Sequence, residues 1–301
     1  IPAYLSLARV NYELGRAREG EAHFWAAVAA IRDTVDAALV YEDVKYVVND
    51  QEMAAFARLS WPDEYAAYFR KVWVSRDPIP SQAYNVRLAE HYRRLLYVEK
   101  YYLFDGLKTW HDTPNRLGEL DLPPPFALND RLNAMGVIYV RHGAPRDTDK
   151  GSEAGGSSNE SWYYSKTAKL PRMVFHFSGG VSSWGSNWRL TSPPGSRNRV
   201  RWDVEKRIRE ARRSVELGYR TDRHTWGKRE EPLETNLYVA TFAGEENLRT
   251  LEVYYDVPIK QWGKRQRADA DTSAVYEYSL SLHDDEWRLL DQQIGQETYE
   301  T

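Results

Sequence analysis

AMGVIYVRHGAPRD, residues 134–147, is the stretch that decides how this chain is divided. Its centre, residues 137–140, places four β-branched or aromatic side chains in a row, which predicts a buried β-strand. Gly143 and Pro145 come next, with turn chemistry that would end the strand. The chain before this stretch has helical periodicity, and most of the chain after it alternates as strands do. We therefore predict an α+β protein that is helical in front and sheet-rich behind.

The composition excludes several classes of site. The chain has 301 residues, which suggests two or three domains, and its net charge of −3 gives no reason to expect nucleic acid or an anionic membrane as a partner. It has no cysteine, so disulfides, thiolate zinc sites and a cysteine nucleophile are excluded. No apolar run reaches the roughly 18 residues that a membrane-spanning helix needs. Because the sequence opens at Ile1, we expect a mature or partial product.

Residues 1–32 have the pattern of a helical hairpin. Small residues, among them Ala8, Gly15 and Gly20, recur at the spacing that lets two antiparallel helices touch. The hairpin resembles one tetratricopeptide repeat, with Tyr4 where Trp is common. A single repeat cannot bury both of its faces, so we expect either further repeats before it or packing on the next helices.

Residues 33–112 are predicted to continue in helices. Apolar residues recur at every third or fourth position through 34–58. A second helix starts at Pro62 and ends before Asp77 and Pro78. Ser81 is the expected cap of a third helix, from about 82 to 104. The charged residues of that third helix are expected to be solvated or paired: Arg87, Glu90, Arg93, Arg94, Glu99 and Lys100.

The rest of the chain is predicted to form sheets around one basic helix. Residues 113–196 combine a proline-rich connection with a small mixed or antiparallel sheet, whose strands are expected at 162–164 and 173–177. Residues 197–233 are basic, with twelve Lys or Arg against five Asp or Glu over 197–229, and fit one amphipathic helix. Residues 234–301 alternate in short segments, which predicts a β-sandwich-like region that is incomplete or completed by a partner.

Three stretches taken in order resemble the bacterial GWxTD-domain proteins. They are YFRKVWVSRDPIP at 68–80, YRRLLYVEK at 92–100, and GVIYVRHGAP at 136–145 followed by WYY at 162–164. The name-giving Gly-Trp-x-Thr-Asp is missing, and residues 129–136 occupy its region. The residues that carry the resemblance are Trp73, Asp77, Pro78, Glu99, Gly136, Tyr139, Gly143, Pro145, Trp162 and Tyr163. The resemblance implies repeats in front, a β-sandwich behind, and a periplasmic or extracytoplasmic location peripheral to the membrane.

Arg141 and His142 are the first candidates for chemistry. A guanidinium and an imidazole beside the amides of a glycine turn would suit an anion. The alternative, which we favour, is structural: Arg141 would pair with Asp77 or Glu99 and join helices to sheet. Asp147, Asp149 and Glu153 partly match a calcium loop, but solvated loop acids are the favoured interpretation, so no cofactor or metal is expected.

Tryptophan pairs and basic residues supply candidate contact surfaces. Trp184 with Trp188, and Trp226 with Trp262, would suit either sugar stacking or a protein interface. Arg212 and Arg213 on the basic helix are further interface candidates. We therefore expect a non-catalytic accessory or scaffold subunit of a larger membrane-associated complex, in the bacterial envelope or in energy transduction. The alternatives are a hydrolase that uses Arg141 and His142, and an anion- or carbohydrate-binding protein.

Overall fold

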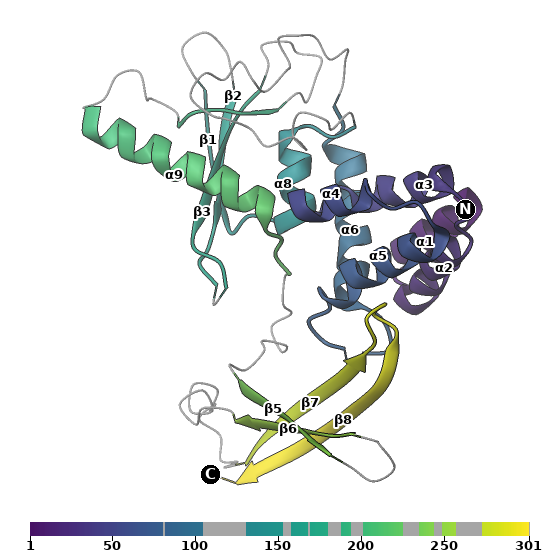
Figure 1. Ribbon diagram of the computed structural model, residues 1–301. Helices are drawn as coiled ribbons and strands as arrows, with labels where there is room; N and C mark the ends of the chain where they lie inside the picture. Colours follow the sequence, from purple (N-terminus) through teal and green to yellow (C-terminus); the bar gives the residue numbers. More distant parts are fainter. Residues whose placement is uncertain are drawn as a thin grey trace. The chain divides into compact units, whose positions relative to one another are not determined.

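The computed structural model describes ten stretches of the chain, which fall into two compact units (Figure 1). The first unit comprises residues 1–225 with 281–291, and the second comprises residues 226–280 with 292–301. The described stretches are residues 1–80, 82–104, 131–152, 158–167, 169–179, 188–193, 201–224, 235–243, 249–256 and 273–300. Among them, no helix is both long enough and apolar enough to cross a bilayer.

Six helices open the first unit. They are α1 (Pro2–Glu13), α2 (Ala17–Ala29), α3 (Thr34–Val44), α4 (Asp50–Phe56), α5 (Pro62–Val74) and α6 (Val86–Tyr101). Local chemistry sets their starts, because the side chains of Asp33, Asn49 and Asn85 each accept a backbone N–H three residues further on. The cap of α6 is therefore Asn85, four residues after the predicted Ser81, which lies outside the described residues.

The first two helices pack closely, as their small residues predicted. A Cβ at Gly20 would lie 3.0 Å from the ring of Tyr12, so glycine is what lets α2 approach α1 there. The ring of Tyr12 stacks on Tyr92 of α6 with centroids 4.6 Å apart, and Phe24 meets Tyr92 and Trp73 edge-on. This aromatic group anchors the hairpin to the helices that come after it.

The predicted central strand is wrong: residues 134–142 form helix α8 (Ala134–His142). Asn133 caps its start by accepting the N–H of Gly136 at 3.0 Å, and Gly143, with φ of 73°, ends it. A short apolar run that is buried on every side looks the same as a strand in sequence, and here packing overrides the β-propensity of residues 137–140. The turn chemistry at Gly143 is thus correctly placed, but it ends a helix.

A four-stranded antiparallel sheet comes after α8. Its strands are β1 (Asp147–Ser152), β2 (Ser158–Tyr164), β3 (Met173–Ser178) and β4 (Arg189–Leu190), in the order β1-β2-β3-β4. The predicted strands at 162–164 and 173–177 lie within β2 and β3. Helix α9 (Arg201–Arg220), which the amphipathic pattern predicted, packs on β3: Val174 donates its N–H to Ser214 Oγ at 3.0 Å.

Two hairpins make up the remaining strands. They pair β5 (Asn236–Ala243) with β6 (Arg249–Asp256), and β7 (Ser273–His283) with β8 (Leu289–Glu300). Each pair is a two-stranded sheet, and β5 and β6 run antiparallel from Asn236 opposite Asp256 to Ala243 opposite Arg249. Within the second unit, the rings of Tyr255 and Tyr278 lie 5.6 Å apart. Most described side chains of β5 and β6 are exposed.

Candidate functional site

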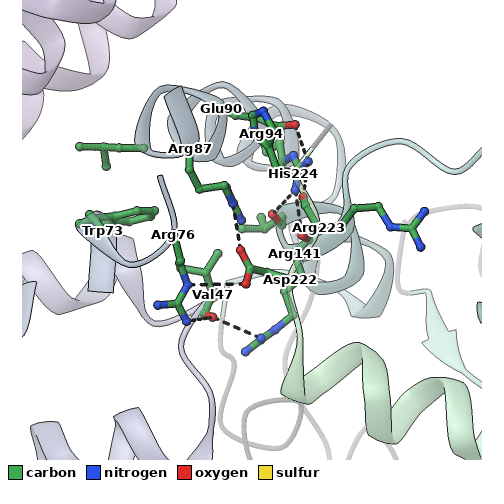
Figure 2. A network of polar contacts seen from close by, with 12 residues as sticks. Val47, Trp73, Arg76, Arg87, Glu90, Arg94, Arg141, Asp222, Arg223 and His224 are labelled. Atoms are coloured by element: carbon green, nitrogen blue, oxygen red, sulfur yellow. Dashed lines mark hydrogen bonds and ion pairs between the residues drawn. The ribbon is translucent and has the colours of Figure 1, made fainter. Parts of the chain in front are cut away.

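Buried arginines distinguish the first unit. Arg87 and Arg94 on α6 and Arg141 on α8 are 1%, 0% and 1% exposed. Arginine normally keeps its charged end in water, and burying it without hydrogen-bonded partners is costly. These three side chains and their hydrogen-bond partners therefore form the buried polar network that we take as the candidate site in the described part of the chain. Figure 2 shows it at the junction of α5, α6 and α8 with the segment 221–224, which comes directly after α9.

Asp222 lies at the centre of one half of this network. Arg87 donates from Nε to Asp222 Oδ2 at 2.9 Å, and Arg76 Nε lies 3.6 Å from Oδ1 (Figure 2). Arg76 also donates to Glu52 at 2.8 Å. Burial opposes the ionisation of Asp222, but the positive charges of Arg87 and Arg76 outweigh it, so the pKa of this carboxyl lies below its usual value. Asp222 is therefore charged at neutral pH.

Glu90 lies at the centre of the other half. Its carboxylate accepts from Arg94 Nη2 and lies 2.5 Å from His224 Nδ1. Burial raises the pKa of Glu90, but the His224 contact and the charge of Arg94 outweigh it and bring the pKa to about 2. Arg94 also donates to the carbonyls of Arg141 at 2.8 Å and Arg223 at 2.7 Å. The same guanidinium thus binds a carboxylate, the end of α8 and the segment 221–224.

The sequence suggested that Arg141 pairs with Asp77 or Glu99, but it pairs with neither in the structure. It leaves α8 toward the chain between α3 and α4, where Nη2 donates to the Val48 carbonyl at 2.5 Å. On its other side the guanidinium lies 5.0 Å from the centre of the Tyr219 ring. The suggested pairing was wrong because residues 134–142 form a helix, and the side chain of Arg141 points in a different direction from a helix than from a strand. Burial lowers the pKa of Arg141 to about 10, which leaves it charged at neutral pH.

Asp77 and Glu99, the two acids suggested for Arg141, have other partners. Glu99 lies 2.6 Å from Arg9 and 3.0 Å from Arg131. The carboxylate of Asp77 accepts the N–H of Ile79 at 3.1 Å and so shapes the turn after α5. Burial raises the pKa of Asp77 to about 6. Neither acid therefore joins Arg141 to the helices that precede it.

His142 is also an internal residue. Its Nε2 lies 2.8 Å from the Gly218 carbonyl, so the ring carries its proton on Nε2. Burial lowers the pKa of His142 to about 3, which makes the ring neutral at physiological pH. Gly218 is glycine for a steric reason, because a Cβ there would lie 2.5 Å from Phe175 Cζ. Arg141 and His142 are thus adjacent in sequence, but one bonds to the α3–α4 connection and the other to α9.

A separate hollow of about 960 Å³ lies where β1 begins and β2 ends. Its walls include Arg146, Lys166 and Arg172 together with Asp147 and Asp149, so its charge is mixed. Two of the three predicted calcium ligands are therefore on one wall, whereas Glu153 lies outside the described residues. Among the residues that the structure does place, no three His, Asp or Glu side chains are arranged to hold a metal.

The predicted aromatic and motif residues are only partly brought together. Trp188 is half-buried beside Gly179, while Trp184, Trp226 and Trp262 lie outside the described residues. Arg212 and Arg213 are exposed on α9. Gly136, Tyr139 and Trp162 all lie beside Tyr102. The ring centroids of Tyr139 and Trp162 are 5.9 and 5.8 Å from that of Tyr102. Trp73 lies in the helical core instead, and Tyr163 and Pro145 lie near the hollow and the start of β1.

The sequence analysis missed the centre of the network because it expected the charges of α6 to be solvated or paired without naming their partners. Arg87, Glu90 and Arg94 recur at three and four, which places them on one helix face beside the apolar stripe. That regular spacing could have indicated a shared buried face, because charged residues that are only solvated need not recur at helical spacing. Asp222 and His224 gave no signal, because their partners lie more than a hundred residues away.

Chemically, the network joins elements of the first unit. Its carboxylates contact arginines or His224, and four guanidinium groups also bind backbone carbonyls. The arrangement holds the segment 222–224 through Asp222, the carbonyl of Arg223 and the ring of His224. Compared with protein-family models, with curated proteins and with solved structures, the chain has no match in any of the three.

Proposed function

We propose that this protein is a non-catalytic accessory subunit, a scaffold that docks onto a larger protein complex and stabilises it. The observation that carries the proposal is a contrast within the described residues. The first unit buries charged side chains to hold itself together, whereas the hairpin of β5 and β6 leaves large apolar side chains exposed. Exposed apolar surface on an otherwise ordered element is typical of an interaction site.

The register of the β5–β6 hairpin divides its exposed apolar residues between two faces, with Leu237, Val239, Leu251 and Tyr255 on one face and Tyr238, Phe242 and Tyr254 on the other. Leu237 stands opposite Tyr255, Val239 opposite Val253, and Thr241 opposite Leu251. Leu237 and Val239 are each 57% exposed. A two-stranded hairpin is marginally stable by itself and offers free edges to a further strand. A partner that covers this face would complete the β-sandwich-like region that the alternating sequence predicts.

Helix α1 supports a second docking surface. Tyr4, Leu7, Val10 and Leu14 are exposed large apolar residues, and their spacing keeps them on one side of the helix. In a tetratricopeptide-like hairpin, the outer face of one helix pair contacts the next pair. We therefore propose that α1 and α2 form such a hairpin and that α1 contacts a further helix of the assembly.

The kind of assembly is inferred from the resemblance to GWxTD-domain proteins. Trp73, Gly136, Tyr139 and Trp162, which carry that resemblance, all have buried positions. Those proteins are exported by bacteria, so the proposed setting is the periplasmic side of a membrane-anchored complex in the envelope or in energy transduction.

The test is affinity purification of the tagged full chain from solubilised native membranes, followed by mass spectrometry. Val239→Asp charges the face of β5–β6 that carries Leu237 and Leu251, and Thr250→Asp charges the other face, which carries Tyr238 and Phe242, so the pair shows which face the partner covers. We expect one set of subunits to co-elute in constant ratio with the wild type and with Thr250→Asp, and to be lost with Val239→Asp. A chain that runs as a monomer and recovers no such set would overturn the proposal.

A further inference from the structure

The hollow where β1 begins and β2 ends is lined by backbone that the first unit holds in place. Tyr164, which lines the hollow and is buried, donates from its OH to the Gly143 carbonyl at 2.9 Å. The Ser165 carbonyl accepts from Arg223 of the buried network at 2.8 Å. The end of β2 is therefore fixed before a ligand arrives, and a site that is formed in advance lowers the cost of binding.

Three cationic side chains line the hollow beside the connection from β2 to β3. Arg146 donates from Nη1 to Ser165 Oγ at 3.0 Å, which brings its guanidinium to the residue that follows β2, and Lys166 comes next along the chain. Arg172 lies just before β3, with its guanidinium carbon 5.7 Å from the centre of the Tyr163 ring. The connection between the two strands therefore forms a positive side of the hollow.

Two carboxylates line the hollow from β1. Asp147 and Asp149 are alternate residues of that strand, so their side chains leave it on the same face. Asp147 stands opposite Tyr163 in the register with β2, and its Oδ1 accepts the N–H of Thr148 at 2.9 Å. Among the residues that the structure places, neither carboxylate forms an ion pair with the three cations of the hollow. Both signs of charge are therefore open to a ligand.

The distance between the two sides sets the length of a ligand that carries both charges. Asp149 belongs to β1 and Arg172 precedes β3, and β2 lies between these strands. Neighbouring strands are about 4.8 Å apart, so the two backbones are separated by roughly 10 Å. A free α-amino acid carries its ammonium and its carboxylate on one carbon atom, which is too short for that span. An extended peptide advances about 3.3–3.6 Å per residue, so about two to four residues reach across.

We propose that the hollow binds a short zwitterionic peptide, with its free carboxylate at Lys166 and Arg172 and its free ammonium at Asp147 and Asp149. The ring of Tyr163 lies between the two sides and contacts the middle of the peptide. The volume of about 960 Å³ is within the range of ligand sites and has room for a tripeptide. A simple anion would meet the carboxylates of β1, a simple cation would meet three cations, and a neutral sugar would leave both sides without a counterion.

Isothermal titration calorimetry of the full chain with trialanine is the first test. N-acetyl-trialanine lacks the ammonium, trialanine amide lacks the carboxylate, and free alanine has both charges without the length. We expect each of these to bind about tenfold or more weakly than trialanine, because each loses a charge-assisted contact. Maltotriose, a neutral sugar, should not bind. Absence of saturable trialanine binding, equal affinity for its blocked forms, or binding of maltotriose alone would overturn the proposal.

Two substitutions test which residues make the two contacts. Asp149→Asn should weaken trialanine about tenfold and leave N-acetyl-trialanine unchanged, because that peptide has no ammonium to lose. Arg172→Gln should likewise weaken trialanine and leave the amide unchanged. Lys150→Gln, whose side chain is 73% exposed on the opposite face of β1, is the matched control and should change none of the affinities. A variant that weakens free and blocked peptides equally, with its circular dichroism unchanged, would contradict the assigned contacts.

Discussion

The arginine network of the first unit and the β5–β6 hairpin of the second are opposites. In the network, side chains that prefer water are buried and joined to one another across distant segments. In the hairpin, side chains that avoid water are exposed on strands that, among the described residues, pair only with each other. Breaking the first should cost folding free energy, while breaking the second should cost binding. Four changes, from the largest expected effect to the smallest, test that contrast.

Arg94→Met should have the largest effect on stability. It leaves Glu90 and the carbonyls of Arg141 and Arg223 without their shared donor. Removing one partner of a buried ion pair typically costs about 3–5 kcal/mol. Urea denaturation followed by circular dichroism should show this loss. Arg93→Met, whose side chain is 60% exposed, should change the unfolding free energy by less than about 0.5 kcal/mol. Equal losses in the two variants would contradict a network role for Arg94.

Acid should weaken the first unit next most strongly. The pKa of His142 is about 3, below its usual 6.5. Between these values the unfolded chain binds more protons than the folded chain, so stability decreases as the pH is lowered from 6.5 to 3. Glu90, with a pKa of about 2 instead of 4.5, adds stability above pH 4.5 that is lost toward pH 2. Through His142 alone we expect about 2–4 kcal/mol less stability at pH 4 than at pH 7; the buried His91 and His176, with pKa values of about 3 and about 4, act in the same direction, and Asp77, with a pKa of about 6, acts in the opposite one.

His142→Gln separates the histidine contribution from that of the carboxylates. The variant cannot gain the proton that His142 gains on unfolding, so its urea midpoint should fall less between pH 7 and pH 4. The same variant distinguishes a structural from a catalytic His142. A structural residue lowers the midpoint at pH 7, whereas a catalytic one would leave it unchanged while an activity is lost.

Gly218→Ala should come third. The new Cβ would lie 2.5 Å from Phe175 Cζ, and overpacking of this kind typically costs about 1–3 kcal/mol, although alanine suits a helix better than glycine. Gly151→Ala, where a Cβ meets nothing within 4 Å, is the control. Combining Gly218→Ala with Phe175→Leu should cost less than the sum of the two single changes. Strict additivity would show that the two residues are not in contact.

Val239→Asp should have the smallest effect on the first unit. Val239 is exposed, so the unfolding free energy of the first unit should change by less than about 0.5 kcal/mol. The same substitution is expected to abolish recovery of the partner subunits. A large loss of stability without loss of binding would reverse the contrast between the two regions. Amide hydrogen exchange of the first unit, compared between variant and wild type, gives the measurement.

The sequence predicted the elements better than it predicted their contacts. Helix α9, helix α5 and the strands β2 and β3 have strong local patterns, and the structure has them where expected. Helix α8 was mistaken for a strand because eight of its nine residues are buried, which leaves no exposed polar face from which to judge the period. The resemblance to GWxTD-domain proteins and the scaffold role stay predictions.

The site was harder to predict than the fold for a physical reason. Arg87 and Asp222 are separated by 135 positions, and no local pattern encodes a contact that only the folded chain makes. The sequence did single out Arg141 and His142, and both are buried polar residues at a junction. Their partners turned out to be backbone carbonyls, which every residue supplies and no sequence motif marks.

The position of Asp222, Arg223 and His224 has a consequence for synthesis. These residues complete the polar contacts of α5 and α6, yet they are made after α9, well over a hundred residues later. While the ribosome is still translating the sheet, the early helices carry Arg87 and Glu90 without these partners. The nascent helices should therefore stay open to proteases and chaperones until residue 224 has left the exit tunnel.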